Sequence, residues 1–289
     1  MAIHNLGSIN IDHFYSVPHL PAPGETLAAT AYGIGLGGKG ANQSTAAAKA
    51  GARTVHIGAV GPEGAWTVER LNGAGVDTTH VSVLETPTGH AIINVDATGE
   101  NAIVLFPGAN LALPFPKVVS ALSEAAPGDT LLLQNETAHQ EKAARHGRDL
   151  GLRVVYSAAP FDPTAVRAVL PFTTLLILNA VEAEQLCAAL DTTIEALDVP
   201  EILITRGAQG AEWRHRDGNR AFAPALSVKA QDTTGAGDTF AGYFCAGLDL
   251  GQKPQAALAW AAKAAALKVT RRGTADAIPS AAEVAAFGT

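Results

Sequence analysis

The chain has 289 residues, of which 47% are apolar and 16% are charged. This composition excludes a disordered protein, a collagen and a small disulfide scaffold, because it supplies enough apolar material for a large core. The formal net charge of −7 disfavours nucleic acid as a partner. Lys263 and Lys268 interrupt the Ala-rich run at residues 256–269, so no apolar stretch reaches the ~18 residues of a membrane helix. We therefore expect no membrane span.

The N-terminal segment Met1–Leu6 has neither the basic region nor the long apolar region of a secretory signal. We therefore expect a cytoplasmic protein whose first strand begins almost at once. The two cysteines, Cys187 and Cys245, lie among apolar residues without ligand-like spacing. This pattern predicts buried free thiols rather than a disulfide or a metal site.

Short apolar runs bounded by Gly, Pro or polar residues predict strands. In chain order they are Ala2–Leu6, Thr54–Ala59, Asp129–Gln134, Arg153–Ser157, Leu175–Leu178 and Glu201–Thr205. Ala-rich windows between and after them predict helices at Gly40–Ala50, Ala65–Ala74, Lys117–Ala125, Ala138–Leu150, Ala180–Leu190, Asp238–Leu250 and Pro254–Val269. Strands that alternate with helices predict an α/β fold, with a mostly parallel sheet covered by helices on both faces.

Two stretches depart from this alternation. Ile11–Gly37 and Thr88–Pro107 show strand-like patterns but contain no long helix. They predict a small antiparallel sheet inserted into the α/β body, which would act as a lid. An ordinary β-rich edge of the main sheet fits the pattern equally well.

A glycine-rich segment at Gly37–Gln43 leads into a predicted helix. Glycines allow the backbone to approach a ligand closely, and the start of the helix offers free N–H groups. The segment is not a Walker A loop, which needs GxxxxGK[ST]. Taken alone, it fits a tight turn better than a ligand site.

The segment Asp232–Phe240 is more informative. Small residues again lead into a helix and would present several amide N–H groups to an anion. Asp238 at this turn would be repelled by a bound phosphate, so its charge suits a role beside a hydroxyl that attacks the phosphate. As an isolated residue, Asp238 also fits a helix N-cap.

Together the two segments resemble the two signatures of the ribokinase-like (PfkB) carbohydrate kinase family. Matching stretches run nearly from end to end, at residues 6–13, 23–26, 37–43, 108–110, 179–184, 205–207, 232–240 and 269–273. The resemblance implies one domain over residues 1–289, folded as a three-layer α/β/α sandwich. It also implies a small β-sheet lid formed by segments at about 11–37 and 88–107.

The resemblance further implies a sugar site, formed by polar side chains whose hydrogen bonds would pair with the sugar hydroxyls. These roles fall on Asn10, Asp12, Gly38, Lys39, Asn42 and Glu136. Asn10 and Asp12 would also fit a simple turn after the first strand.

In the same way, the resemblance assigns Asp238 as the base that accepts the proton of the attacking primary hydroxyl. An Asp of ordinary pKa is a weak base at pH 7, so positioning would supply much of the effect. The backbone of Gly235, Ala236 and Gly237 would form an anion hole for the transferring phosphoryl group.

The nucleotide and its metal ions are assigned by resemblance too. Asn179 and Glu182 would help to place Mg²⁺ and phosphate, usually through water, although Asn179 also fits a helix cap. Thr205, Gly207 and Gly210 occupy the nucleotide-loop position. A monovalent cation, K⁺, would bind at Asp232, Thr234 and Gly273, although Asp232 also fits the cap of a turn.

The implied activity is ATP-dependent phosphorylation of the primary hydroxyl of D-ribose, giving D-ribose 5-phosphate. Family members for another sugar or a nucleoside, such as fructose, 2-keto-3-deoxygluconate or adenosine, would reuse most of the same residues. A non-catalytic sugar-binding regulator is a third hypothesis, disfavoured by the intact Asp238. An apolar lid face would otherwise be exposed, so a homodimer formed through the lid is also expected.

Overall fold

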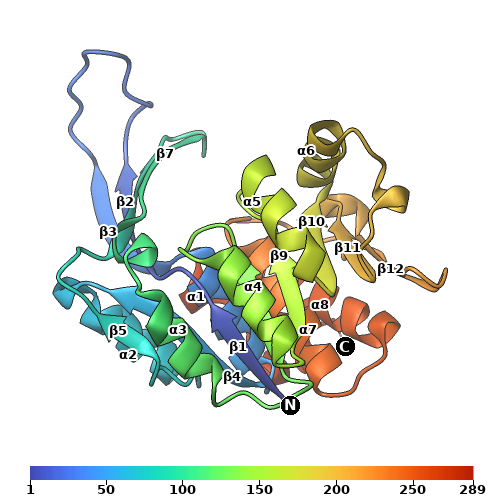
Figure 1. Cartoon of the computed structure of the whole chain (residues 1–289). Helices are drawn as coiled ribbons and strands as arrows, with labels where there is room; N and C mark the ends of the chain where they lie inside the picture. Colours follow the sequence, from blue (N-terminus) through green and yellow to red (C-terminus); the bar gives the residue numbers. More distant parts are fainter. Residues whose placement is uncertain (289) are drawn as a thin grey trace.

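The computed structural model describes residues 1–288, which form two β-sheets flanked by helices. Figure 1 shows the larger sheet inside the body of the molecule, with the β2–β3 hairpin extending away from it. Within residues 1–288, no helix is long and apolar enough to cross a membrane. The expectation of an α/β fold with a second small sheet is confirmed.

The larger sheet contains nine strands in the order β13-β12-β11-β10-β9-β8-β1-β4-β5. It is parallel from β11 to β5, while β12 and β13 form an antiparallel edge. Its strands are β1 (Ala2–Leu6), β4 (Arg53–Val60), β5 (Val81–Val83), β8 (Thr130–Gln134), β9 (Arg153–Ser157), β10 (Leu175–Asn179), β11 (Glu201–Thr205), β12 (Ala211–His215) and β13 (Arg220–Ala223).

Helices cover both faces of this sheet, so that alternate residues of its strands enter two separate cores. Leu132 of β8 packs with Phe244 and Ala261, whereas its neighbours Leu131 and Leu133 pack with helices of the opposite face. One face carries α1 (Lys39–Lys49), α7 (Ala236–Asp249), α8 (Pro254–Val269) and α9 (Ala281–Ala286). The other carries α3 (Phe115–Leu122), α4 (Gln140–Asp149), α5 (Pro163–Val169) and α6 (Ala180–Leu190). A smaller third core includes α2 (Ala65–Gly73).

The smaller sheet contains four strands in the order β3-β2-β6-β7. They are β2 (Asn10–Ser16), β3 (Ala31–Gly37), β6 (Gly89–Val95) and β7 (Asn101–Phe106). Two antiparallel hairpins are joined by a parallel pairing of β2 with β6, so the sheet is not wholly antiparallel as expected. The two stretches that departed from the strand–helix alternation thus meet in space. Whether this sheet moves as a lid stays a prediction.

Two helices begin earlier than the sequence predicted. Helix α1 starts at Lys39, and α7 starts at Ala236. Glycine permits both starts, because the residues before them, Gly38 and Gly235, have φ values of 92° and 71°. Asp238 therefore lies in the first turn of α7, while Gly235 occupies the N-cap position. The interpretation of Asp238 as an N-cap residue is wrong.

The start of α1 lies directly against the end of β1. A Cβ atom on Gly40 would lie 2.3 Å from the Cα atom of Gly7, so no larger residue fits without moving the backbone. The Nδ2 group of Asn5 also donates to the carbonyl of Gly40 at 2.9 Å. This contact brings the glycine-rich segment to the carboxyl end of the parallel strands, where open α/β sheets bind ligands.

Candidate active site

The carboxylate of Asp238 is held by two side chains of α1. Asn42 donates from Nδ2 to Oδ2 at 3.0 Å, and Gln43 donates from Nε2 to Oδ1 at 3.0 Å. Asp238 is only 9% exposed, so these amides replace most of its contact with water. Each carboxylate oxygen thus accepts one fixed hydrogen bond and keeps lone pairs for a further donor.

Asp238 shares the first turn of α7 with unpaired backbone amides. The N–H groups of Gly237 and Asp238 have no acceptor among residues 1–288, as is usual at a helix start. The N–H group of Ala236 instead donates to the carbonyl of Thr233 at 3.2 Å. The free amides and the helix dipole favour an anion at this point.

A buried chain of polar side chains extends behind Asp238. Gln134 donates from Nε2 to the Oε1 atom of Gln43 at 2.8 Å and to Oδ1 of Asn5 at 2.9 Å. Asn5 then donates to Ser44, whose hydroxyl contacts Nδ1 of His56 at 2.8 Å. Burial lowers the pKa of His56 to about 4, so the ring is neutral at pH 7. The chain of hydrogen bonds fixes the rotamer of Gln43.

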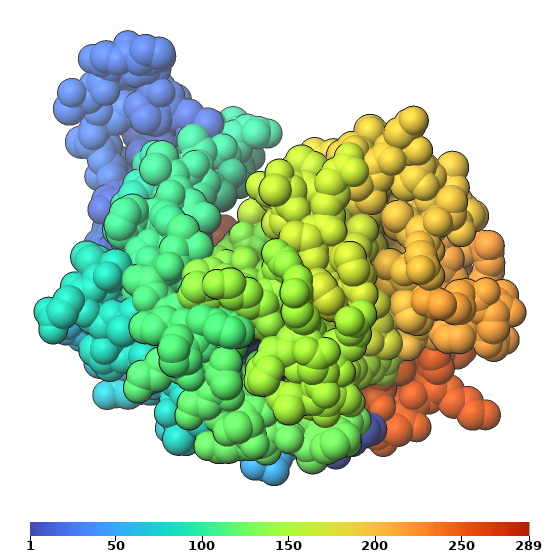
Figure 2. Space-filling model, viewed as in Figure 1, coloured from blue at the N-terminus to red at the C-terminus, as the bar shows by residue number. Residues whose placement is uncertain are grey.

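A small cavity of about 150 Å³ lies between the small sheet and the loops that follow β8 and β9. Figure 2 shows a notch in the surface between the blue-green part of the chain, which includes β7, and the yellow-green part. Most polar side chains of the lining are amides. The lining residues are Asn10, Leu105, Pro107, Asn110, Leu111, Asn135, Glu136 and Pro160.

Two carboxylates lie near each other on this side of the molecule. Burial, reinforced by the charge of Glu136, raises the pKa of Asp12 to about 7. The Glu136 carboxylate accepts from the hydroxyl of Ser8 at 2.5 Å and from the backbone N–H of Lys39 at 3.0 Å. A Cβ atom on Gly37 would lie 2.0 Å from an oxygen of Asp12, so this glycine makes room for the carboxylate.

Lys39 is a positively charged residue that interacts both with Asp238 and with Glu136, which lines the small cavity. Its pKa is raised above the ordinary lysine value, chiefly by the charge of Asp238 and, against the effect of burial, also by Glu136 and Glu182. An ammonium among three carboxylates is charged at pH 7. It lies within electrostatic reach of both the Asp238 turn and the small cavity.

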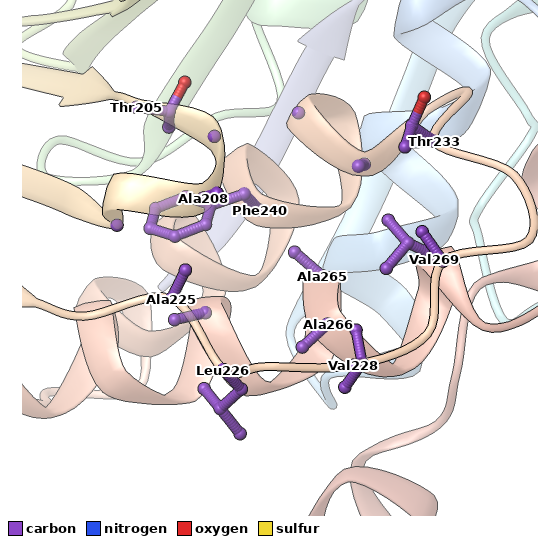
Figure 3. A pocket seen from close by; sticks show the side chains of 16 residues that line it. Thr205, Ala208, Ala225, Leu226, Val228, Thr233, Phe240, Ala265, Ala266 and Val269 are labelled. Carbon is purple, nitrogen blue, oxygen red and sulfur yellow. The ribbon is translucent and has the colours of Figure 1, made fainter.

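A larger cavity of about 360 Å³ opens beside the first turn of α7. Figure 3 shows its mainly aliphatic lining, in which the hydroxyls of Thr205 and Thr233 are the labelled polar groups. Such a lining suits a flat, mostly apolar ring system, with an anion at the adjacent amides. The cavity is lined by Thr205, Gly207, Ala208, Gly210, Ala225, Leu226, Val228, Ala230, Thr233, Ala236, Gly237, Phe240, Ala262, Ala265, Ala266 and Val269.

Asn179 and Glu182 form a reciprocal helix cap at the start of α6. The Oδ1 atom of Asn179 accepts from the N–H of Glu182 at 2.8 Å, and the Glu182 carboxylate accepts from the N–H of Asn179 at 2.8 Å. The capping hypothesis for Asn179 is therefore correct. Burial raises the pKa of Glu182 despite this hydrogen bond, and the charges of Lys39 and Asp238 act on it. The Glu182 carboxylate thus lies within electrostatic range of Lys39 and Asp238.

Asp232 forms hydrogen bonds that link the loop before α7 to the loop after α8. Its carboxylate accepts from the N–H groups of Thr234 and Gly273, both at 2.9 Å. Burial acts to raise the pKa of Asp232, but these hydrogen bonds and the charge of Lys268 hold it below the ordinary value. The Asp232–Thr234 contact is a turn cap of the kind that the sequence allowed.

The structure brings most of the predicted residues to one edge of the main sheet. One group lies around the small polar cavity and the carboxylate at the start of α7; it consists of Asn10, Asp12, Asn42, Glu136 and Asp238. Thr205, Gly207 and Gly210 lie in the lining of the larger cavity, together with Ala236 and Gly237. The sequence reasoning missed Gln43, Gln134, Asn110 and Lys268, together with the α8 residues of that lining. Asn110 donates to Oδ1 of Asn10 at 2.8 Å and so orients it.

An aspartate held beside free helix amides, with a polar cavity on one side and an apolar cavity on the other, is the arrangement of an α/β phosphotransferase. The pfkB family carbohydrate kinase pattern matches residues 3–281. Ribokinase of Haemophilus influenzae is 36% identical to this chain over 297 residues, covering 98% of this chain and 96% of the relative. Deoxyribokinase of Salmonella typhi is 31% identical over 295 residues, covering 97% and 96%.

A solved structure of Arabidopsis thaliana ribokinase complexed with ribose and ATP is similar to this chain. Its TM-score is 0.87 at 28% identity, and the match covers 99% of this chain and 98% of that chain. The chain therefore belongs to the pfkB family of carbohydrate kinases and is a ribokinase-like sugar kinase.

Proposed function

We propose that this kinase transfers the γ-phosphoryl group of ATP to the primary hydroxyl of D-ribose, giving D-ribose 5-phosphate. The observation that carries the proposal is the Asp238 carboxylate, fixed by Asn42 and Gln43 beside the free amides of α7. In this position Asp238 accepts the proton of the attacking hydroxyl. The backbone of Gly235–Gly237, in which the N–H of Gly237 is free and that of Ala236 would have to leave Thr233, and the charge of Lys39 stabilise the transferring phosphoryl group.

The sugar occupies the polar cavity in this proposal. Asn10 and Glu136 line it, and Asp12 lies close enough for the charge of Glu136 to raise its pKa. Gly38, Lys39 and Asn42 complete the site at the start of α1. Carboxylates and amides accept and donate in pairs to neighbouring hydroxyls, which is the chemistry that a pentose requires.

ATP occupies the apolar cavity, with its phosphates directed toward α7. Thr205, Gly207 and Gly210 form one wall of this cavity. Mg²⁺ would be bound chiefly by the phosphates and water, with the carboxylate of Glu182 and the amide of Asn179 as outer-sphere partners. This assignment fits the exposed position of Asn179, the half-buried position of Glu182 and the attraction between Lys39 and the Glu182 carboxylate. The cation supplies charge neutralisation of the phosphates.

A coupled assay of ADP release tests the proposal. The substrates are D-ribose, 2-deoxy-D-ribose, fructose, 2-keto-3-deoxygluconate and adenosine, with Asp238→Asn as the inactive control. We expect the highest kcat/KM with D-ribose, and a 5-phosphate as its product. A higher value for 2-deoxy-D-ribose would favour the specificity of the Salmonella relative instead. Turnover of none of the five would reject the sugar-kinase assignment for these substrates.

The small sheet supports the further proposal of a homodimer. One of its faces exposes Tyr32, Ile34, Val104 and Phe106, which are between 45% and 67% exposed. Apolar patches of this kind commonly mark protein contacts. We expect a dimer by size-exclusion chromatography with light scattering, and a cytoplasmic location. A monomer at micromolar concentration would reject the dimer.

A further inference from the structure

Lys268 is a fully buried lysine close to the catalytic turn. Its side chain is 0% exposed, although lysine is almost never buried without a partner. It lies in the last turn of α8, and its Nζ atom donates to the backbone carbonyl of Asp232 at 3.2 Å. A positive charge is also favoured there by the helix dipole. The chain thus holds a cation at the loop that leads into Gly235–Asp238.

Other oxygen atoms at this loop also accept hydrogen bonds from the protein. Both carboxylate oxygens of Asp232 accept backbone N–H groups, from Thr234 and Gly273. The carbonyl of Val269 accepts from the N–H groups of Gln231 and Asp232, at 2.7 and 3.2 Å. Together with the lysine, these bonds tie the loop to the C-terminal end of α8.

Lys268 interacts electrostatically with more groups than the carbonyl to which it is hydrogen-bonded. Burial lowers the pKa of its ammonium, while the negative charges of Asp232 and Asp238 act to raise it. The lysine is therefore electrostatically coupled to the residue that the proposed function uses as the base. A buried cation that is bonded to the Asp232 carbonyl and attracted by both carboxylates stabilises one geometry of the turn.

We propose that Lys268 is a positioning residue whose ammonium group takes the place of a monovalent cation, so that this kinase needs no K⁺. The proposal rests on the kinase function proposed above. It replaces the K⁺ site expected at Asp232, Thr234 and Gly273, because an ammonium already bonded to the carbonyl of Asp232, and close enough for its charge to act on the Asp232 carboxylate, repels a second cation there. The tethered ammonium orders the loop and so preorganises the amides of α7.

The test uses two substitutions that differ in the space they leave. Lys268→Ala removes the charge and opens room for an ion, whereas Lys268→Met removes the charge but fills the space. We expect both to lower kcat about 10- to 100-fold in buffer free of Na⁺ and K⁺. KCl at constant ionic strength restores most of the activity of Lys268→Ala, more than LiCl does. It restores little for Lys268→Met, and wild type responds by less than about twofold.

Lys263→Ala is the matched control on the same helix. Lys263 also donates its ammonium to a backbone carbonyl, that of Ala285, at 3.2 Å, but it does not line the cavity. Its removal is expected to leave turnover and the absence of a K⁺ response unchanged. A K⁺ response in this variant would point to a general salt effect.

Thermal melting gives a readout that needs no substrate. We expect KCl, compared with choline chloride, to raise the Tm of Lys268→Ala and not that of wild type. If Lys268→Ala folds only in K⁺, the proposal is supported. Strong activation of wild type by K⁺, or a Lys268→Ala variant whose activity, folding and Tm show no response to K⁺, would overturn it. Wild type that phosphorylates no sugar would reject the proposed function alone, since melting still decides the role of Lys268.

Discussion

Gln43 donates a hydrogen bond from Nε2 to the Oδ1 atom of Asp238 at 3.0 Å, across 195 residues of sequence. The Oε1 atom of the same Gln43 amide accepts a hydrogen bond from Gln134, so both ends of the amide are held and its orientation is fixed. Asn42 holds the other carboxylate oxygen. The carboxylate plane of Asp238 is therefore set by α1 before any substrate binds, which is the preorganisation that a weak base needs.

The first prediction concerns Gln43. Gln43→Leu keeps most of the volume but frees one oxygen of Asp238, so the carboxylate can rotate. We expect kcat to fall about 10- to 100-fold with little change in KM for the sugar. Gln255→Leu is the control, because this glutamine bonds the backbone of Phe222 and lines neither cavity. Equal turnover in both variants would show that the amide of Gln43 does not position Asp238.

The second prediction concerns Asp238 itself. Asp238→Asn keeps the shape of the side chain but removes both the charge and the proton acceptor. We expect turnover to fall about 10²- to 10⁴-fold, while ATP binding measured by calorimetry and the Tm stay close to wild type. Turnover within about threefold of wild type would remove Asp238 from the role of base.

Most of the fold could be predicted from the sequence, because buried strands and Ala-rich helices carry strong local patterns. Helix Pro254–Val269 was predicted with its observed ends. The β12–β13 hairpin was missed, because its short strands mix charged and apolar residues. The parallel pairing of β2 with β6 joins segments about 80 residues apart. No local pattern records such a contact.

The site was predicted less completely, for a related reason. Asp238 could be predicted because it follows a glycine-rich turn, and Asp12 because it follows the end of the first predicted strand. Gln43 lies inside a helix, where glutamine is an ordinary residue, and only the contact with Asp238 gives it a role. In the sequence, Lys268 is one of two charged residues that interrupt an apolar run. Only its complete burial points to a role, and that burial depends on how α8 packs, which the sequence pattern does not show.

The third prediction concerns Asp12 and pH. With a pKa of about 7 in the folded protein, Asp12 gains its charge as the pH rises from 6 to 8, and an ionised carboxylate accepts more hydrogen bonds from sugar hydroxyls. We expect KM for D-ribose to fall over this range in wild type. In Asp12→Asn, KM is higher and this pH dependence is absent. A KM profile with the same slope in both proteins would contradict the assignment.

The same pKa leads to a separate prediction about stability. Burial raises the pKa of Asp12 from 3.8 to about 7, so between these values the folded protein binds a proton more tightly than the unfolded chain. The contribution of Asp12 to stability is therefore greatest at low pH and is lost as the pH rises through 7. Asp12→Asn removes this penalty and is expected to stabilise the protein at pH 8 by on the order of 1–4 kcal/mol. Denaturant titrations of both proteins at pH 5 and pH 8 measure it, and a gain that does not grow with pH would exclude this origin.

The last prediction concerns the apolar cavity. Ala265 lies on α8 in the wall of that cavity, where a larger side chain would project into the space proposed for the base of ATP (Figure 3). Ala265→Leu is expected to raise KM for ATP about tenfold, because part of the cavity is filled, and to leave KM for D-ribose unchanged. Ala259→Leu is the control, since Ala259 is an exposed residue of the same helix and does not line the cavity. The decisive comparison is the ratio of the two KM values. A rise in KM for the sugar rather than for ATP would contradict the assignment, because it would place the sugar in the apolar cavity.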